Sequence, residues 1–322
     1  MKVIEVKDLT KKFDKFTAVN RISFDVEKGE ILGLLGPNGA GKTTTLSMLA
    51  TLVKPTSGSA VVNGFDVYNN PSMVRKSIGF VFQDPSSDDT LTGRENLYLH
   101  GLMYGVNGIN EKIEMVLKLV ELTDKKDILV KNYSGGMRRR LELARGLLHE
   151  PKILFLDEPT LGLDPQTRIK LWDYIKKLSN ESNVSIIITT HYMDEVESLC
   201  NRIAIIDHGK IVAMDSPAEL KNKIGGDLVR LKIKNPANLK GVKKLKYVKK
   251  IKRDGDFIVL TVVNSGVHLQ EILKVIGKVE AVELRPPTLN DVFLHYTGRG
   301  IRETEGEGGW AERAMNYRGK ST

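Results

Sequence analysis

The alternation of apolar and polar stretches over the first two thirds of the chain predicts strands and helices in turn. Residues 31–35 and 153–156 are continuous apolar runs, a pattern typical of strands that are buried on both faces. Further strands are expected at residues 3–6, 22–26, 78–82, 184–190 and 203–206, and helices at residues 41–52, 134–149, 165–178 and 194–200. This order predicts an α/β fold with a mainly parallel sheet that helices cover on both faces.

One interval interrupts the alternation. Residues 94–122 carry helical patterns only, so we expect a helical subdomain at about 84–150, inserted into an α/β domain that spans residues 1–220.

The composition shifts after Pro217. A separate α+β domain is predicted at residues 221–297, because strand and helix patterns alternate there on a smaller scale. Its expected strands are residues 228–233, 257–263 and 279–284, and its expected helices are residues 269–276 and a short one after Pro287. Residues 298–322 are rich in Gly, Arg and Glu, with little to bury, and are expected to form a flexible tail.

A glycine-rich loop joins the apolar run at 31–35 to the helical pattern after it. The loop matches G-x-x-x-x-G-K-[ST], in which glycines let backbone N–H groups approach phosphate oxygens at the positive end of a helix. Lys42 is expected to reach the β- and γ-phosphates, and the Thr43 hydroxyl to coordinate Mg²⁺. The residues expected to contact the nucleotide here are Gly36, Pro37, Asn38, Gly39, Ala40, Gly41, Lys42, Thr43 and Thr44.

Two acidic residues follow the apolar run at 153–156. Open α/β sheets bind ligands at the carboxyl ends of their strands, so Asp157 and Glu158 are predicted to share a site with the glycine-rich loop. Asp157 suits the outer shell of Mg²⁺, and Glu158 is placed to polarise an attacking water, either as a general base or as an orienting group.

Three further features are candidates for the same site. Ser134, Gly135 and Gly136 open a helix and form a second N-terminal anion site, with the serine as a hydroxyl donor. Gln83 follows a predicted strand, and His191 ends another near the expected γ-phosphate. Each has a plainer alternative: a simple helix cap for the serine, a surface amide for the glutamine, and a hydrogen-bonded structural histidine.

The order and spacing of these motifs resemble those of the ATP-binding subunits of ABC transporters over about residues 2–220. The resemblance implies that two such domains enclose two ATP molecules, each between the phosphate loop of one subunit and the signature Ser134-Gly135-Gly136 of the other. It implies a P-loop NTPase core with an antiparallel β subdomain, and ATP and Mg²⁺ as cofactors. It also implies a second ATP-binding subunit, as a homodimer, and a membrane-spanning permease on a separate chain.

The same resemblance assigns residue roles. It implies that Glu158, His191 and Gln83 are catalytic, that Thr43, Gln83 and Asp157 hold the metal, and that the D-loop Asp164 contacts nucleotide.

The signature departs from the usual family pattern. Tyr133 and Met137 stand where Leu and Gln are usual, but the serine and glycines that contact the anion are kept, so activity is expected to survive. The aromatic residue that stacks on adenine would be Phe13. There are two alternatives: Phe13 is an ordinary core residue, or Phe16 stacks on adenine in its place.

The closing segment of the second domain also carries a resemblance. Residues 285–294 resemble the end of ATPases in the daunorubicin-resistance-type exporter branch, and the Gly-Met-Arg-Arg-Arg-Leu-Glu-Leu run after Ser134 fits that branch too. A generic regulatory or dimerisation appendage is the alternative. Exporters of this branch handle hydrophobic drugs, lipids or polysaccharides, and the cargo is not specified by this chain.

Composition and charge narrow the picture. Hydrophobic residues make up 41% and charged residues 28%, which is typical of globular proteins. The formal charge is +9, and residues 221–253 hold thirteen Lys or Arg and a single acid. Such a patch could bind nucleic acid or anionic lipid. Because no aromatic residues are interleaved for base stacking, a solvated surface is favoured and no nucleic acid is expected.

The lone Cys200 is predicted to be a packed thiol.

No stretch approaches the roughly 18 apolar residues of a spanning helix. We therefore expect a peripheral subunit at the cytoplasmic face of the cell membrane, which docks on its permease through residues 83–122, near the loop that holds Pro85, Thr90 and Leu91. The alternative is a soluble ABC-type ATPase that acts on nucleic acid or a protein scaffold. It is disfavoured because long coiled coils, cysteine clusters and a second ATPase cassette are lacking. A catalytically dead regulator is disfavoured because Lys42 and Glu158 are present.

Overall fold

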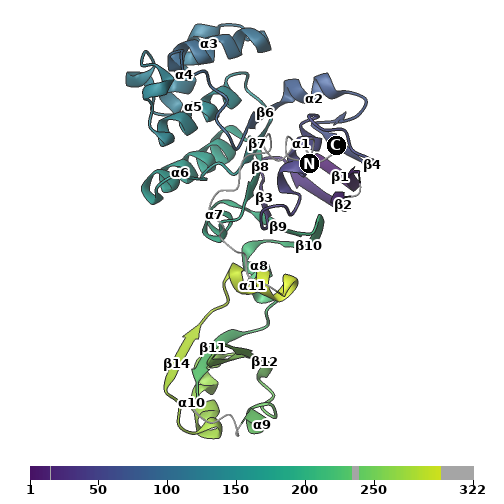
Figure 1. The fold of residues 1–322 in the computed structure, drawn as a ribbon, viewed down its shortest axis with the longest axis vertical. Coiled ribbons are helices and arrows are strands. Elements are labelled where there is room, and N and C mark those ends of the chain that lie inside the picture. Colours follow the sequence, from purple (N-terminus) through teal and green to yellow (C-terminus); the bar gives the residue numbers. More distant parts are fainter. Residues whose placement is uncertain (15, 234–238, 299–322) are drawn as a thin grey trace, which may run out of the picture. The chain divides into compact units, whose positions relative to one another are not determined.

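The structure, a computed structural model, describes residues 1–14, 16–233 and 239–298 (Figure 1). Two compact units divide between Met214 and Asp215. The division falls a few residues before position 220, where the sequence places the end of the first domain. Apart from Gly298, the predicted flexible tail lies outside the described residues. Among the described helices, none combines the length and apolarity needed to cross a bilayer.

A six-stranded sheet forms the centre of the first unit. Its order is β10-β9-β3-β8-β7-β6, and the β9–β3, β3–β8, β8–β7 and β7–β6 pairs are parallel. Every residue of β3, β7 and β8 is buried, as their apolar sequences predict. The strands are β3 (Ile31–Leu35), β6 (Ile78–Val81), β7 (Ile153–Asp157), β8 (Ser185–Thr190), β9 (Arg202–Asp207) and β10 (Lys210–Asp215). The predicted mainly parallel sheet is confirmed.

A four-stranded antiparallel sheet lies beside it in the order β2-β1-β4-β5. Its strands are β1 (Lys2–Phe13), β2 (Phe16–Glu27), β4 (Ser57–Val62) and β5 (Phe65–Asp66), and helices α1 (Lys42–Leu49) and α2 (Pro71–Ser77) belong to the same region. One hydrophobic cluster joins the two sheets through α1, with Val6 of the antiparallel sheet, Leu46 of α1 and Phe155 of the parallel sheet among its members. The core that supports the glycine-rich loop is therefore shared by both sheets.

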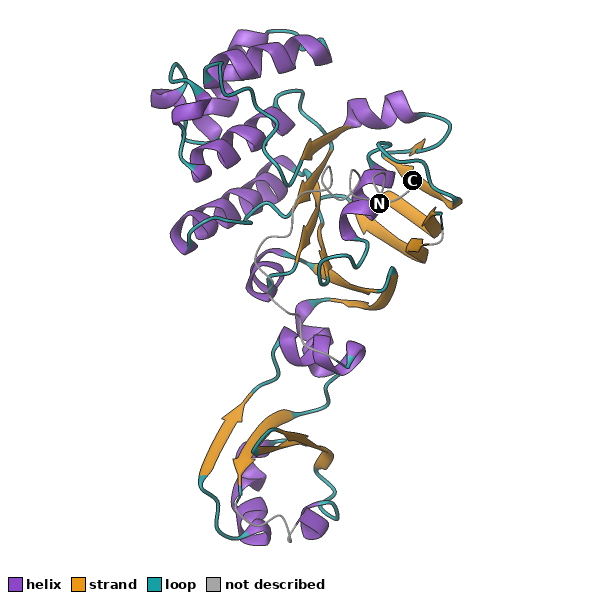
Figure 2. Ribbon diagram, viewed as in Figure 1, coloured by secondary structure: helices purple, strands orange, loops and turns teal. Residues whose placement is uncertain are grey.

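The helical interval forms a group of its own next to the β6 edge of the sheet (Figure 2). It contains α3 (Gly93–Tyr104), α4 (Ile109–Leu119), the short 3₁₀ helices η1 (Thr123–Lys125) and η2 (Val130–Asn132), and α5 (Gly135–Leu147). Thr92 and Glu95 form a capping box that fixes the start of α3. Two further helices, α6 (Pro165–Ser182) and α7 (Met193–Leu199), pack against each other and follow β7 and β8. The predicted inserted helical subdomain is confirmed.

Cys200 directly follows α7 and is buried as a free thiol. A Cβ atom on Gly33 of β3 would lie 2.8 Å from its sulfur, so the thiol packs tightly against the central sheet. Burial raises the pKa of this thiol well above its ordinary value. The prediction of a packed thiol is confirmed.

The second unit is a small α+β domain. Its antiparallel sheet has the order β12-β13-β11-β14 and carries a separate core that includes Val229, Leu260 and Ile272. Its elements are α8 (Pro217–Asn222), β11 (Asp227–Lys232), α9 (Leu239–Val242), β12 (Val248–Asp254), β13 (Phe257–Val262), α10 (Ser265–Ile276), β14 (Ala281–Arg285) and α11 (Leu289–Thr297). The edge strand β12 exposes Lys249 and Lys250, a solvated surface that also discourages edge-to-edge pairing.

The segment at 285–294 closes this unit. Arg285 donates two hydrogen bonds to the Asp291 carboxylate, at 2.6 and 2.9 Å, and Thr288 and Asp291 form a capping box at the start of α11. Burial alone would raise the pKa of Asp291, but the hydrogen bonds from Arg285 and Thr288 outweigh it and hold the pKa below its usual value. Val292 and Phe293 are fully buried. The motif thus ends the domain with an anchored helix.

Candidate functional site

The glycine-rich loop runs from the end of β3 to the start of α1. A Cβ atom on Gly36 would lie 2.3 Å from the carbonyl oxygen of Ile206, and one on Gly41 would lie 2.4 Å from that of Ala18. Gly41 also has a φ of 106°, which side chains of L-residues rarely adopt. The loop can therefore take this tight path only with glycine at both positions.

Lys42 is the first residue of α1 and is buried, with 4% of its surface exposed. Its Nζ donates to the carbonyl oxygens of Gly36 and Pro37 at 2.8 and 3.2 Å, and lies 3.3 Å from Glu158 Oε1. The lysine charge is thus aimed into the loop and toward the carboxyl end of β7.

Asp157 lies at that end of β7, within hydrogen-bond distance of α1. Its Oδ1 accepts from the hydroxyls of Thr43 at 3.0 Å and Thr189 at 2.5 Å. Burial raises the pKa of Asp157, and the hydrogen bonds from the two threonines act against this rise. Two oxygen ligands, one of them anionic, therefore converge where the sequence predicts Mg²⁺.

The donor set fits that ion. In the part of the chain that the structure describes, no cluster of three or more His, Cys, Asp or Glu side chains could hold a metal on its own. Mg²⁺ is commonly held by one or two carboxylates together with substrate phosphates, so a single carboxylate and a hydroxyl beside a phosphate loop suit it.

Glu158 follows Asp157 in a left-handed backbone conformation, with a φ of 46°. Its N–H donates to the Thr189 hydroxyl at 3.0 Å, which helps to hold this strained geometry. Its carboxylate lies between Lys42 Nζ, at 3.3 Å, and His191 Nδ1, at 3.2 Å. Burial alone would raise its pKa, but His191 and Lys42 outweigh it and hold the pKa below its usual value. The carboxylate is therefore ionised at neutral pH.

The pairing of β6 with β7 places Gln83 at the same edge of the sheet as Glu158. β6 and β7 are parallel, and Val81 pairs with Leu156. Gln83 and Glu158 each lie two residues beyond this pair, so both follow the carboxyl ends of neighbouring strands. Gln83 is half-buried, unlike a plain surface amide.

The signature residues form a second group. Ser134 caps α5 by accepting from the Met137 N–H at 3.2 Å, and it is exposed together with Gly135. A Cβ on Gly135 would meet nothing within 4 Å, whereas one on Gly136 would lie 2.8 Å from Thr167. The structure thus brings the start of α5 next to the start of α6.

Asp164 belongs to this second group. It caps α6 by accepting from the Thr167 N–H at 2.9 Å and the Thr167 hydroxyl at 2.6 Å. Within this chain, Ser134 therefore acts as the helix cap that the sequence offered as an alternative, and Asp164 caps α6 in the same way. The usual Leu is replaced by Tyr133, which is buried and donates from its hydroxyl to the Lys125 carbonyl at 2.7 Å. That departure therefore serves packing.

Phe13 and Phe16 face each other across the β1–β2 hairpin. They are 42% and 54% exposed, so the interpretation of Phe13 as a core residue is wrong. The Lys11 Nζ lies 4.9 Å from the centroid of the Phe13 ring. Lys11 thus lies over one face of the Phe13 ring, and both rings are partly exposed.

Thr189 is a site residue that the motifs do not reveal. It is fully buried, and its hydroxyl bridges the Asp157 carboxylate and the Glu158 backbone. The available signal is a pair of hydroxyl residues, 189 and 190, at the end of an otherwise apolar strand directly before His191.

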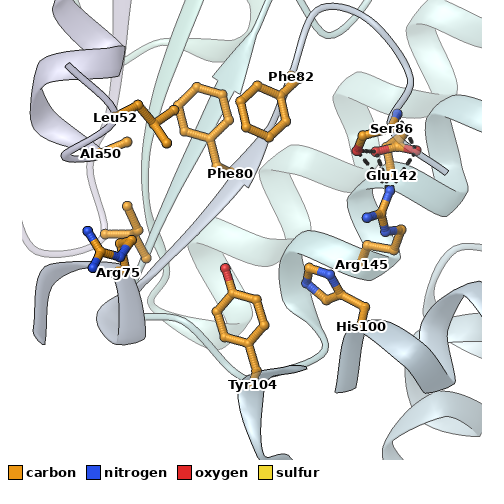
Figure 3. A pocket seen from close by; sticks show the side chains of 11 residues that line it. Ala50, Leu52, Arg75, Phe80, Phe82, Ser86, His100, Tyr104, Glu142 and Arg145 are labelled. Carbon is orange, nitrogen blue, oxygen red and sulfur yellow. Dashed lines mark hydrogen bonds and ion pairs between the residues drawn. The ribbon is translucent and has the colours of Figure 1, made fainter. Parts of the chain in front are cut away.

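A cavity of about 110 Å³ lies beside the Gln83 segment (Figure 3). The rings of Phe80 and Phe82, 4.4 Å apart between centroids, line one side. On another side, Glu142 accepts hydrogen bonds from Ser86 and from Arg145. Burial alone would raise the pKa of Glu142, but Arg145 and the serine hydroxyls hold it below its usual value. The cavity is thus apolar with one buried charged corner.

Comparisons with known proteins add a family to this geometry. The family described as "ABC transporter" matches residues 19–161, and the "ATP-binding protein DrrA1-3-like, C-terminal domain" matches residues 216–297. The chain is 38% identical to the daunorubicin/doxorubicin resistance ATP-binding protein DrrA of Streptomyces peucetius, over 92% of this chain and 93% of that protein. It is 35% identical to the linearmycin resistance ATP-binding protein LnrL of Bacillus subtilis, over 94% of this chain and 100% of that protein.

A solved structure is similar as well. The ATP-binding cassette MJ0796, described as a dimer in a post-hydrolysis state bound to ADP and Pi, shares 26% identity with a TM-score of 0.61. The match covers 66% of this chain and 98% of that chain.

Proposed function

The chain belongs to the family of ABC transporter ATP-binding proteins, with a DrrA-like C-terminal domain, and on this premise we propose that it powers export of a small molecule or lipid through a separate permease. Members of this family bind and hydrolyse ATP, form dimeric cassettes and work with membrane permease subunits. The observation that carries the residue assignment is the convergence of Lys42, Asp157, Glu158 and His191 at one edge of the parallel sheet.

Lys42 and Glu158 suggest how ATP binding prepares hydrolysis. The lysine lies 3.3 Å from the glutamate, and a triphosphate offers it a stronger anionic partner. When Lys42 binds the phosphates, the Glu158 carboxylate keeps its contact with His191 and is free to accept a proton from the attacking water. Gln83 and His191 would orient that water and the γ-phosphate. Mg²⁺, held by Thr43 and Asp157 with Gln83 nearby, would neutralise phosphate charge.

The second group of residues supports a shared site. Ser134, Gly135 and Asp164 are exposed, and α5 presents the N-terminus of a 13-residue helix. An ATP molecule held by the phosphate loop of another copy would satisfy this anion site. The adenine would stack on Phe13, with Phe16 as the neighbouring candidate. We therefore propose a homodimer with two ATP molecules between the subunits.

The test of this proposal is the dependence of hydrolysis on protein concentration. If each site needs two chains, the specific activity should fall on dilution below the dimerisation constant, and ATP should increase the mass seen by light scattering. Lys42→Met serves as the control that cannot respond to ATP. A specific activity that stays constant on dilution, with a strictly monomeric mass, would contradict the shared site.

We place the permease contact on the surface that includes the cavity of Figure 3 and helix α3. Leu99, Leu102 and Met103 of α3 are exposed apolar residues, which is typical of a protein–protein surface. This surface adjoins Gln83 in sequence and would carry its movement to the permease. The protein would then be peripheral, at the cytoplasmic face of the membrane.

A charge on this surface tests the contact. Leu102→Glu should leave ATP hydrolysis by the isolated subunit within about twofold, because Leu102 is exposed and far in sequence from the phosphate loop. In vesicles that contain the co-purified permease, the same variant should lose most ATP-driven transport of daunorubicin. Lys118→Glu, on the exposed side of α4, is the matched control. Unchanged transport by Leu102→Glu would remove this surface from the proposal, and no transport by wild type would remove daunorubicin as cargo.

Two further assignments follow the same premise. We propose that the predicted division into an ATP-binding domain (1–220, with its helical subdomain at about 84–150) and a DrrA-like domain (221–297) holds with a boundary a few residues earlier, before α8. The alternative of a soluble ATPase that acts on nucleic acid is not favoured, because the relatives matched over most of the chain include resistance and export ATP-binding proteins.

A further inference from the structure

Arg139 is a buried cation between the helical group and the central sheet. It lies on α5, one turn after Gly135, and only 6% of its surface is exposed. Its Nε donates to the Pro159 carbonyl at 2.6 Å, its Nη2 to the Asp157 carbonyl at 3.0 Å, and its Nη1 to the Phe82 carbonyl. One guanidinium therefore holds three backbone oxygens.

These three oxygens frame the catalytic edge of the sheet. Phe82 directly precedes Gln83, whereas Asp157 and Pro159 flank Glu158 on both sides in the chain. Arg139 thus fixes the main chain at the ends of the neighbouring parallel strands β6 and β7, and only the planar fork of arginine has donors for all three oxygens.

Burying the Arg139 guanidinium costs desolvation free energy, which the fold alone does not require. Among the ion pairs of residues 1–14, 16–233 and 239–298, none contains Arg139, so the groups in direct contact with its charge are carbonyl oxygens. Carboxylates such as Glu142 and Asp157 favour the charged form from a greater distance. Burial lowers the pKa of this guanidinium to about 10, which still leaves it protonated at neutral pH. A desolvated cation of this kind stabilises a fold no better than apolar packing would.

The two neighbouring arginines show how unusual this contact is. Arg138 donates to Asp89 and to the Lys131 carbonyl, and Arg140 donates to the carbonyls of Val120 and Glu121. All four acceptors lie within the helical region. Of the three arginines, Arg139 alone reaches the strand ends through these hydrogen bonds.

We propose that Arg139 is a positioning residue that couples the signature helix to the hydrolytic site of its own subunit. The inference deepens the proposed function and rests on it, because Ser134 and Gly135 at the start of α5 would contact the ATP of the partner. When that contact moves or orders α5, Arg139 moves the ends of β6 and β7 with it. Gln83 and Glu158 then reach their working positions only when the partner site is filled.

The test compares Arg139→Met with Arg140→Met in the full chain. Both changes remove a guanidinium that binds two or more carbonyls, but only the first releases the strand ends. For Arg139→Met we expect kcat to fall by about tenfold, since small displacements of reacting groups have effects of this size or larger. Its KM for ATP should stay within about threefold, because Lys42 and the loop glycines are untouched. Arg140→Met should keep kcat within about twofold of wild type.

Thermal unfolding is measured on the same samples, to separate positioning from stability. A lowered Tm with wild-type kcat in Arg139→Met, equal kcat losses in both variants, or a loss confined to KM would each overturn the proposal. If Arg139→Met does not fold, the Arg139→Lys variant tests the proposal instead. It keeps the buried charge but cannot hold all three oxygens, and should lose about fivefold in kcat; wild-type kcat would overturn the proposal. Absence of hydrolysis in wild type would instead contradict the proposed function.

Discussion

A Glu158→Gln subunit should bind ATP as wild type does and hydrolyse it at least about a hundredfold more slowly. The glutamine keeps the size of the side chain and tolerates the φ of 46°, but it cannot accept a proton from water. Because ATP persists in the closed state, the variant should accumulate as an ATP-bound dimer. Turnover at saturating ATP and light scattering with and without ATP measure both effects.

A matched control separates the role of Glu158 from the removal of a negative charge in general. Glu111→Gln makes the same chemical change on the exposed surface of α4 and should leave both readouts unchanged. Near-normal hydrolysis by Glu158→Gln would show that another group activates the water. Slow hydrolysis without dimer accumulation would keep the carboxylate role and reject the sandwich.

Lys42→Met and Ser134→Glu subunits should each be inactive alone and restore activity to one another when mixed. Lys42→Met loses the phosphate-binding charge, and Ser134→Glu places a carboxylate where the partner's γ-phosphate would lie, so each should lose at least about a hundredfold in rate. A mixed dimer joins the intact loop of the second variant to the intact signature of the first. About half of the dimers are mixed and hold one intact site of two, which gives up to about a quarter of the wild-type rate.

The informative control mixes Lys42→Met with the double variant that carries both changes. No combination of these two subunits contains an intact site, so the mixture should stay inactive. Recovery in this control would point to subunit misassembly or contamination. If the first mixture also fails to recover although mixed dimers form, the phosphate loop and the signature act within one chain or the two sites cannot work singly.

The parallel sheet and the phosphate loop were predictable because local chemistry determines them. Runs such as 31–35 and 153–156 are apolar at almost every position. The glycines at 36 and 41 lie so close to backbone carbonyl oxygens that a side chain at either position would clash with them. Strand β4 and helix α2 were not predicted. The Ser-Gly-Ser start of β4 is exposed, and α2 buries only Val74, so neither shows a clear hydrophobic period.

The motif residues of the site were predictable, but the contacts that position them were not. Thr189 binds one side chain and one backbone N–H. Arg139 binds the carbonyls of Phe82, directly after β6, of Asp157, the last residue of β7, and of Pro159, two residues beyond it. Backbone partners leave no trace in residue identities, and these contacts join positions that are far apart in the sequence. Arg139 also stands in a run of three arginines, which hides the one that is buried.

The packed state of Cys200 makes the protein well suited to labelling with thiol-reactive probes. It is the one cysteine in the sequence, its sulfur is buried beside Gly33, and burial suppresses the reactive thiolate. A cysteine placed at an exposed position outside the nucleotide site, such as 111 or 118 of α4, would therefore react first without any need to remove the native one. Pairs of dyes or spin labels on two subunits could then follow the approach of the subunits in real time.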